Sequence, residues 1–217
     1  MQDLVHLLHG FKLTDREDRW VWNDGANGPF SVADCKRILK TNVPAVNGFS
    51  LKWEAWVPLK INLLSWRAGR YKLPTRVALI RRRVNIPDSL CPFCSLCDED
   101  VNHLMVGCGL AYDVWSSICK WCKLDPFFAY DYDDVLKLYK NVHAGKWRKK
   151  IVRGIVMTTA WAIWNARNEK IFRNKGIKVA DVVAEVKSKT FLWLKYRSKY
   201  KDIAWNDWAS YPLYMCI

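Results

Sequence analysis

The sequence predicts a mainly helical fold with a small β-hairpin near its N-terminus. Apolar residues recur at helical spacing through most of the chain, one early stretch alternates around turn residues, and 51% of the 217 residues are hydrophobic. The longest apolar run, 154–164, is shorter than the roughly 20 residues that cross a bilayer. The first residues lack the features of a secretory signal. We therefore expect a globular intracellular protein, in nucleus or cytoplasm, whose cysteines stay reduced.

The first expected elements are a hairpin and a helix. Residues 19–33, RWVWNDGANGPFSVA, hold two short β-prone runs around a turn rich in Asp, Asn and Gly. Ser31 then precedes VADCKRILK, with Asp34 three positions later, which is typical of a helix N-cap. A helix is expected from there to about Thr41, where NVPAVNG ends it.

The middle of the chain predicts three further helices and a loop. Pro58 marks the start of one helix, and Pro74 separates it from a second that runs through Leu79. Residues 110–124 place Val, Trp and Ile side chains on one stripe of a third helix. The following stretch, DPFFAYDYDD at 125–134, is rich in acidic and aromatic residues and predicts an exposed loop.

The last third of the chain predicts two long helices. Residues 146–172 and 179–200 both show helical apolar spacing, and the turn RNKG separates them. Four segments follow from these elements. They are a lead-in at 1–17, a domain at 18–124, an acidic aromatic loop at 125–135, and a basic helical region at 136–217 that packs on the domain.

Half of the eight cysteines lie in one stretch of eighteen residues, CPFCSLCDEDVNHLMVGC. Cys91, Cys94, His103 and Cys108 form C-x2-C-x8-H-x4-C, a set of four ligands that suits tetrahedral Zn(II). Because protein groups fill all four positions, the pattern favours one structural zinc ion over a catalytic one. We therefore expect a helical domain that is stapled by zinc. On an unbroken helix His103 and Cys108 would point about 140° apart, so we expect Gly107 to end the helix.

The other cysteines leave alternatives open. Cys97 extends the pattern to C-x-x-C-x-x-C, which occurs in iron–sulfur ligation, although no further cysteine lies between it and Cys108. Buried cysteines without a metal are a third interpretation. Cys119 and Cys122 also spell C-x-x-C, but they fall within a predicted helix and have no histidine nearby. We expect them in the core.

Positive charge is concentrated in the last third of the chain. The formal charge is +14, and residues 136–217 hold 18 Lys and Arg against 5 Asp and Glu, whereas residues 81–135 hold 5 against 9. Two blocks, 146–150 and 187–201, mix cations with aromatic residues, which suits phosphates and stacked bases. The alternative is that they are solvated helix faces. The candidate contacts to RNA or single-stranded DNA are Lys146, Arg148, Lys149, Lys150, Lys195, Arg197 and Lys199.

Several stretches, taken in order, resemble the zinc-binding domain that follows the reverse transcriptase in plant LINE-type, non-LTR retrotransposons. They are WVWNDGANGPFSVADCKRIL, WEAWVPLKINLLSWRAGRYKLPTRVALIRRRV, CPFC, EDVNHLMVGC and AIWNARNEKIF, and they span about residues 18–172. Cys35 stands where the family more often has an aromatic residue, and Cys97 lies outside its pattern. The resemblance implies nucleic-acid handling beside a polymerase. The ligands that it implies are Cys91, Cys94, His103 and Cys108.

No pattern of catalytic residues accompanies these motifs. In YDYDD the position two before the adjacent carboxylates is Asp131, whereas a reverse transcriptase site needs an aromatic residue there. G-x-S-x-G, G-x-x-x-x-G-K and HExxH are absent from the sequence. We therefore expect neither an enzyme nor a small-molecule substrate.

Two functions remain open from the sequence. The first is a zinc-fixed, nucleic-acid-binding accessory module derived from a retrotransposon reverse transcriptase. The second is a protein-interaction module or structural remnant that packs against a reverse transcriptase without binding nucleic acid itself. A basic stripe facing solvent would favour the first function, and exposed tryptophans would favour the second.

Overall fold

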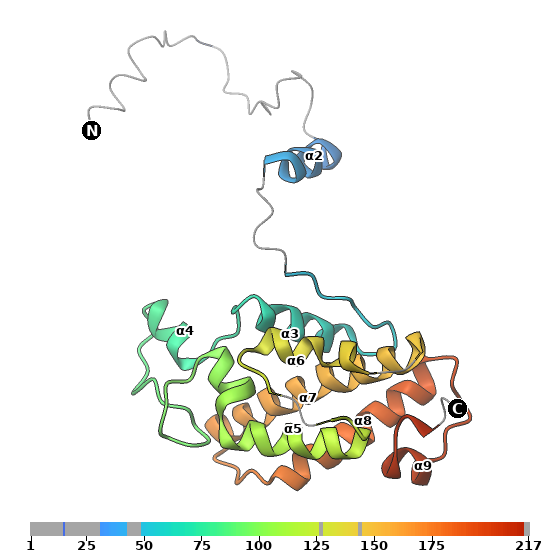
Figure 1. Cartoon of the computed structure of the whole chain (residues 1–217). Coiled ribbons are helices and arrows are strands. Elements are labelled where there is room, and N and C mark those ends of the chain that lie inside the picture. Colours follow the sequence, from blue (N-terminus) through green and yellow to red (C-terminus); the bar gives the residue numbers. More distant parts are fainter. Residues whose placement is uncertain (1–14, 16–30, 43–48, 126–127, 143–144, 215–217) are drawn as a thin grey trace. The chain divides into compact units, whose positions relative to one another are not determined.

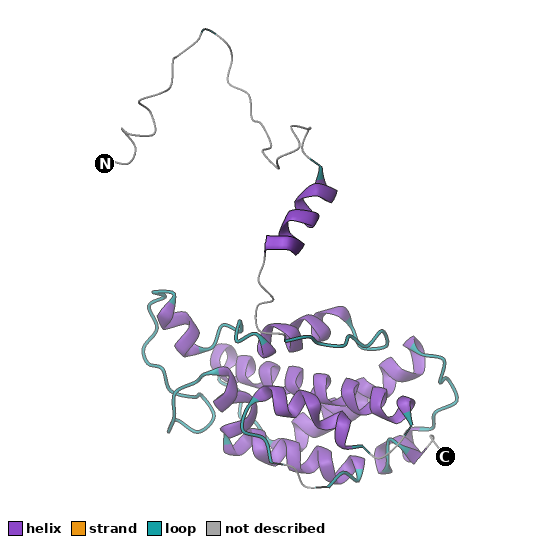
Figure 2. Cartoon of the chain, turned by 45° about the horizontal axis from the view of Figure 1, so that its top comes forward, coloured by secondary structure: helices purple, strands orange, loops and turns teal. Residues whose placement is uncertain are grey.

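The computed structural model describes residues 15, 31–42, 49–125, 128–142 and 145–214. The chain forms two compact units, 1–48 and 49–217. Figure 2 shows helices joined by loops, and no β-strand occurs within the described ranges. Leu90 and Asp98 form a single antiparallel bridge. The mainly helical part of the predicted fold class is thus confirmed.

The first unit contributes one described helix, α2 (Val32–Asn42). Ser31 Oγ accepts a hydrogen bond from the backbone N–H of Asp34 at 3.1 Å, which confirms the predicted N-cap. A β-hairpin was predicted at 19–33. Residues 19–30 of it lie outside the part of the chain that the structure describes. Its last two positions belong to α2.

The second unit is built around one long helix, α7 (Lys146–Arg173). Every residue from Ile151 to Ala160 is buried, so the helix is covered on all sides there, and all of these residues except Arg153 are apolar or small. Figure 1 shows the neighbouring helices around it. These neighbours are α3 (Leu59–Gly69), α5 (Gly109–Cys122), α6 (Tyr132–Lys137), the 3-10 turn η2 (Leu138–Asn141) and α8 (Val179–Arg197).

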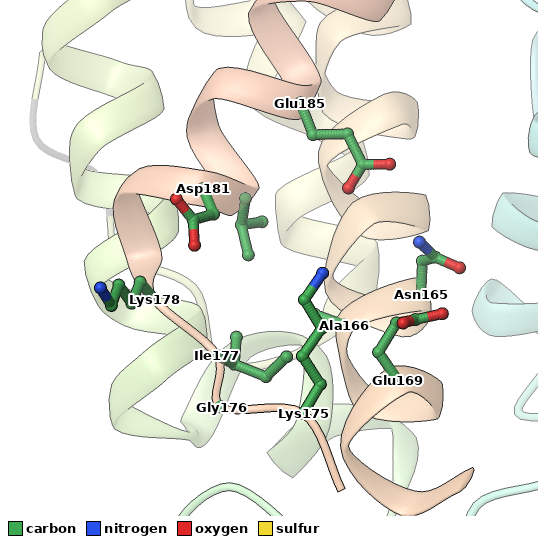
Figure 3. A pocket seen from close by; sticks show the side chains of 10 residues that line it. Asn165, Ala166, Glu169, Lys175, Gly176, Ile177, Lys178, Asp181 and Glu185 are labelled. Carbon is green, nitrogen blue, oxygen red and sulfur yellow. The ribbon is translucent and has the colours of Figure 1, made fainter. Parts of the chain in front are cut away.

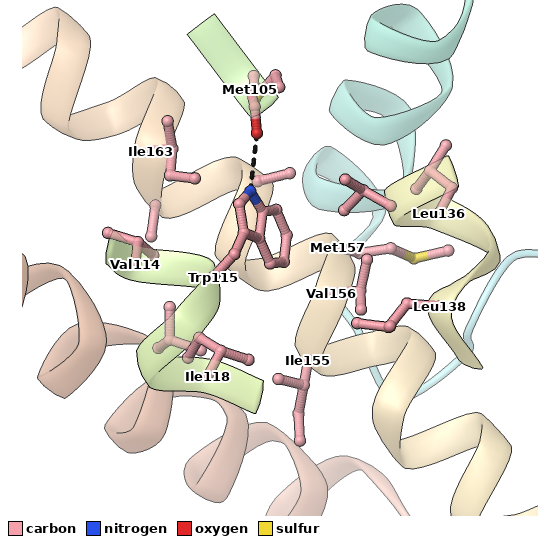
Figure 4. Packing of buried hydrophobic residues seen from close by; sticks show 14 of the residues in the cluster. Met105, Val114, Trp115, Ile118, Leu136, Leu138, Ile155, Val156, Met157 and Ile163 are labelled. Carbon is pink, nitrogen blue, oxygen red and sulfur yellow. Dashed lines mark hydrogen bonds between the residues drawn. The ribbon is translucent and has the colours of Figure 1, made fainter. Parts of the chain in front are cut away.

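The core around α7 is held by aromatic and aliphatic side chains from several of these elements. Trp115 of α5 lies beside Val114 and Ile118, and its Nε1 donates a hydrogen bond to the backbone oxygen of Met105 at 2.7 Å (Figure 4). Residues of α7 and of the α6–η2 segment complete the cluster. The Trp115 bond fixes the turn that precedes α5 to the core.

Close packing at one position of α7 depends on a glycine. A Cβ atom placed on Gly154 would lie 2.0 Å from the Trp56 ring, so only glycine lets this ring rest directly on the helix backbone. One residue earlier, Arg153 forms a buried ion pair with Glu54 at 3.1 Å. Its guanidinium also lies 4.2 Å from the centre of the Tyr139 ring. The polar groups of this region are therefore packed between α7 and the segment that precedes α3.

The remaining predicted helices are confirmed, and two elements differ from expectation. Pro58 precedes α3, and Thr75 caps α4 (Arg76–Arg81), where its Oγ1 accepts from Ala78 N–H at 3.4 Å. α9 (Trp205–Ser210) was not predicted, and its Trp208 is fully buried against α5.

The second difference is α6, which occupies part of the predicted acidic loop. Asp131 Oδ1 accepts from Asp134 N–H at 3.0 Å, and further acidic residues in the first turn complement the helix dipole. Tyr132, Val135 and Leu136 are buried, so an amphipathic pattern lies beneath the acidic composition. None of the described helices is both long and apolar enough to span a bilayer.

Candidate metal centre

The first two candidate ligands lie on a tight turn closed by backbone hydrogen bonds. Cys91 N–H donates to the carbonyl of Cys97 at 2.8 Å, and Ser95 N–H donates to the carbonyl of Cys91 at 2.8 Å. Ser95 has φ 54°, a left-handed conformation that lets the chain reverse. This turn brings Cys91 and Cys94 to one side of the loop.

The other two candidate ligands lie at the ends of a π-helical turn, η1 (His103–Gly107). Cys108 N–H donates to the carbonyl of His103 at 2.7 Å, a bond between residues five apart. Asp100 Oδ1 accepts from His103 N–H at 2.7 Å and starts the turn. The prediction that the helix ends at Gly107 is confirmed, because Cys108 is extended. The turn itself is π-helical, a form that the sequence pattern did not predict.

These two turns bring four ligand atoms together. Cys91, Cys94, His103 and Cys108 each offer one atom, and all four atoms lie within 4.8 Å of one another. Cys91 Sγ is 3.9 Å from Cys108 Sγ, and Cys94 Sγ is 3.3 Å from His103 Nε2. Cys97 is exposed and does not belong to this group.

The spacing and the chemistry of this group fit a zinc ion. With Zn–S at about 2.3 Å and Zn–N at about 2.0 Å, a tetrahedron has sulfur–sulfur edges of about 3.8 Å and sulfur–nitrogen edges of about 3.5 Å. Both measured distances are close to these values. Three thiols and one imidazole would fill all four corners, which is typical of structural sites.

Burial differs across the group. Cys91 and Cys108 are buried, whereas Cys94 and His103 are partly exposed. The contact with Cys108 and burial together raise the pKa of the Cys91 thiol, and the same contact lowers the pKa of Cys108. A dication bound here would therefore displace protons, so its affinity would rise with pH.

A buried ion pair ties residues 91–108, which we name the metal loop, to α7. Glu99 is fully buried, and its carboxylate accepts two hydrogen bonds of 2.7 Å from the Arg167 guanidinium. It also accepts from Arg76 N–H at 2.7 Å, at the start of α4. The backbone of Glu99 bonds to Ser89 and Val77. A single side chain thus joins the loop, α4 and α7.

Sequence reasoning missed this pair as part of the site. Arg167 belongs to the stretch AIWNARNEKIF, and it is a cation in a helix that the core surrounds. Such a buried arginine requires an acidic partner. The sequence does not say which of the acidic residues it is, because Glu99 lies 68 positions away.

The predicted nucleic-acid contacts lie at the start of α7 and around the end of α8. Lys146, Lys150, Arg197 and Lys199 are exposed. Arg148, Lys149 and Lys195 are partly buried. Trp147 stacks on Tyr200 with ring centres 3.7 Å apart and an interplanar angle of 25°, which brings the two blocks together. We name the seven cations with Trp147 and Tyr200 the basic junction.

The first part of the second basic block is used within the fold. Lys187 Nζ donates to the carbonyl of Ala209 at 3.0 Å and lies over the Trp121 ring. Lys189 pairs with Glu185 at 2.7 Å. These two lysines therefore match the alternative interpretation of the block, as solvated or packed helix residues.

A cavity of about 410 Å³ lies where the end of α7 meets the start of α8 (Figure 3). Its lining includes the carboxylates of Glu169, Asp181 and Glu185 together with Lys175 and Lys178. Glu169 pairs with Arg173, and Glu185 pairs with Lys189. Two of its three carboxylates are thus engaged in ion pairs, and the cavity lies at the opposite end of the α7–α8 pair from the basic junction.

Comparison with known proteins agrees with the geometry of the metal loop. Residues 30–115 match the family model described as zinc-binding in reverse transcriptase. The match contains all four residues of the cluster and ends within α5. No curated protein and no solved structure matches the chain. The resemblance to a reverse transcriptase zinc-binding domain is thus supported over this range.

Proposed function

We propose that this chain is a non-catalytic, structural-zinc module derived from the reverse transcriptase of a plant LINE-type retrotransposon, and that it binds RNA or single-stranded DNA. The binding surface is the basic junction. The single observation that carries this proposal is the stack of Trp147 on Tyr200, which joins two basic blocks that are far apart in the sequence.

Charge at the basic junction supports binding to phosphates. Its seven cations come from residues 146–150 and 195–199, and neither stretch contains an acidic residue. A single strand that contacts seven cations would show a slope of log K against log salt of about −5. Such a slope distinguishes phosphate binding from a solvated helix face.

Aromatic side chains at the same place support stacking on bases. Tyr196 is 73% exposed and lies between Lys195 and Arg197 in the sequence. An exposed ring beside cations can stack on a base of any identity, which suits single strands without sequence preference. Trp147 and Tyr200 stack on each other and hold the two blocks in place.

The metal supports the proposal through the fold alone. The four donors of the cluster fill a tetrahedron, so the ion takes a structural role in which no coordination position is left for a substrate. Glu99 and Trp115 connect the metal loop with the core around α7. The basic junction begins at the other end of that helix.

The proposal is tested with the zinc-loaded full chain and uniform single-stranded RNA and DNA oligonucleotides at a series of salt concentrations. Substitution of Lys146, Lys149 and Lys150 by glutamine should weaken binding and reduce the salt slope by about 2. The matched control replaces Arg81, Arg82 and Arg83 by glutamine, which removes the same charge from exposed residues elsewhere. Equal affinity and slope in the two variants would overturn the proposal.

One observation favours the second candidate function, packing against a reverse transcriptase. Leu59, Leu63 and Trp66 are exposed at i, i+4 and i+7 on α3, so one face of this helix is apolar and solvent-facing. Leu63→Glu should abolish binding to a purified LINE-type reverse transcriptase, whereas Leu192→Glu, at an exposed position of α8, should not. If the reverse transcriptase binds the two variants equally well, this function is contradicted.

A further inference from the structure

A groove runs between α5 and the segment that leads into α6. Two adjoining cavities of about 430 and 580 Å³ share Val106, Tyr112, Asp113, Phe128 and Ala129 in their linings, so they form one continuous depression. One wall is η1, which carries His103. We name this depression the acidic aromatic groove.

Three aromatic rings at the groove are turned to solvent. Tyr112 is 66% exposed, Phe128 is 90% exposed and Tyr130 is 87% exposed. The rings of Phe128 and Tyr130 lie 6.3 Å apart between centres. Clustered exposed aromatic rings are typical of interaction sites, because their large apolar surface is otherwise left in water.

The floor of the groove is fixed by the core. Trp115 lines it, is buried, and is held by its hydrogen bond to Met105. Val135 of α6 is fully buried at the same place. A preformed apolar floor lowers the cost of binding, since few side chains must be ordered.

The charge around the groove is opposite to that of the whole chain. Asp100 and Asp134 each accept a hydrogen bond from the backbone N–H of a residue that lines the groove, in a chain whose formal charge is +14. Asp113 lines both cavities and is exposed, and its carboxylate has no ion-pair partner within the described ranges. Lys120 is the only Lys or Arg among the described residues that line the groove. With three carboxylates against one lysine, the groove favours cations over phosphates.

From this charge and shape we propose that the acidic aromatic groove binds a segment of a partner protein in which aliphatic or aromatic side chains are flanked by Lys and Arg. The apolar side chains occupy the floor beside Trp115. The cations face Asp113, Asp100 and Asp134, the acidic residues at the groove. This site is separate from the basic junction, so one chain can hold a nucleic acid and a basic polypeptide together.

The test measures fluorescence anisotropy of a labelled peptide with Leu–Phe pairs between Lys–Arg pairs, added to the zinc-loaded full chain. Two control peptides carry Glu in place of the cations or Ser in place of the apolar residues. We expect the affinity of each control peptide to be at least about tenfold lower than that of the basic apolar peptide. Equal binding of either control peptide would overturn the proposal.

Variants locate the binding surface. Phe128→Ser and Asp113→Lys should each weaken the basic apolar peptide about tenfold, while Phe172→Ser, at an exposed ring outside the groove, should not. Unchanged binding in the first two variants would refute the site. NMR shifts of the unmodified chain provide a measurement that needs no variant, and the peptide should move the signals of Tyr112 and Trp115. If single-stranded RNA displaces the peptide from the groove, the groove is a nucleic-acid site and the proposal is overturned.

Discussion

Glu99→Gln removes the charge from a fully buried carboxylate while the size of the side chain is kept. The carboxylate accepts three hydrogen bonds, two from the Arg167 guanidinium and one from Arg76 N–H. The glutamine amide keeps one acceptor oxygen and turns an NH2 group towards donors. Arg167 then stays charged and buried without its counter-ion.

The expected loss is large. Removal of one partner from a buried ion pair costs about 3–5 kcal/mol. In a chain of this size each kcal/mol lowers Tm by about 2–4 °C, so the variant should melt about 6–20 °C lower. The matched control is Glu169→Gln, whose partner Arg173 is exposed at the surface. This control should lose no more than about 0.5 kcal/mol.

The assay is urea unfolding of the zinc-loaded chain followed by tryptophan fluorescence. A mutant cycle with Arg167→Gln and the double variant isolates the interaction between the two side chains. The double variant should lose less than the sum of the single variants, because it leaves no unpaired charge. Losses that simply add would refute the reasoning. Zinc affinity, measured against a competing chelator, should fall at least about tenfold in Glu99→Gln.

Three further predictions concern the metal, the close packing of α7 and the second buried ion pair. Cys91→Ser should lose zinc and unfold the metal loop, and a fully folded, metal-free variant by mass spectrometry and NMR would contradict it. Gly154→Ala should lower the free energy of unfolding by about 1–3 kcal/mol because its Cβ meets the Trp56 ring, whereas Gly176→Ala meets no atom within 4 Å and serves as the control for urea titration. Burial raises the pKa of Glu54, so the folded chain holds this proton where the unfolded chain releases it. Its contribution to the free energy of unfolding should therefore fall as pH rises from the ordinary glutamate pKa through the raised one. Glu54→Gln should remove this part of the pH dependence, and an unchanged pH profile would argue against it.

Local signals predicted the helices well because each one depends on residues close together in the sequence. Ser31 reaches an N–H three residues later, and Pro58 and Thr75 act at the first turns of their helices. The α6 helix was missed because its buried Tyr132 and Val135 lie among acidic residues that are typical of a loop. Composition alone therefore concealed an amphipathic turn.

The metal cluster was predicted as a group, but the way in which the chain assembles it was not. Cysteine spacing indicated the residues that come together, while the π-helical turn between His103 and Cys108 has no sequence period of its own. Glu99 with Arg167, and Trp147 with Tyr200, are pairs formed by tertiary packing over long sequence separations. A single sequence contains the members of such pairs but not their pairing.

The two buried arginines of α7 fix the number of residues that can lie between them. Arg153 and Arg167 are 14 positions apart, so a regular helix carries them about 21 Å apart and within about 40° of the same face. Each meets a glutamate from the earlier part of the chain. One inserted residue between them would rotate one arginine by about 100° relative to the other, and a pair would be lost. Evolution or design can exchange side chains along this stretch, but insertions and deletions there should be rejected.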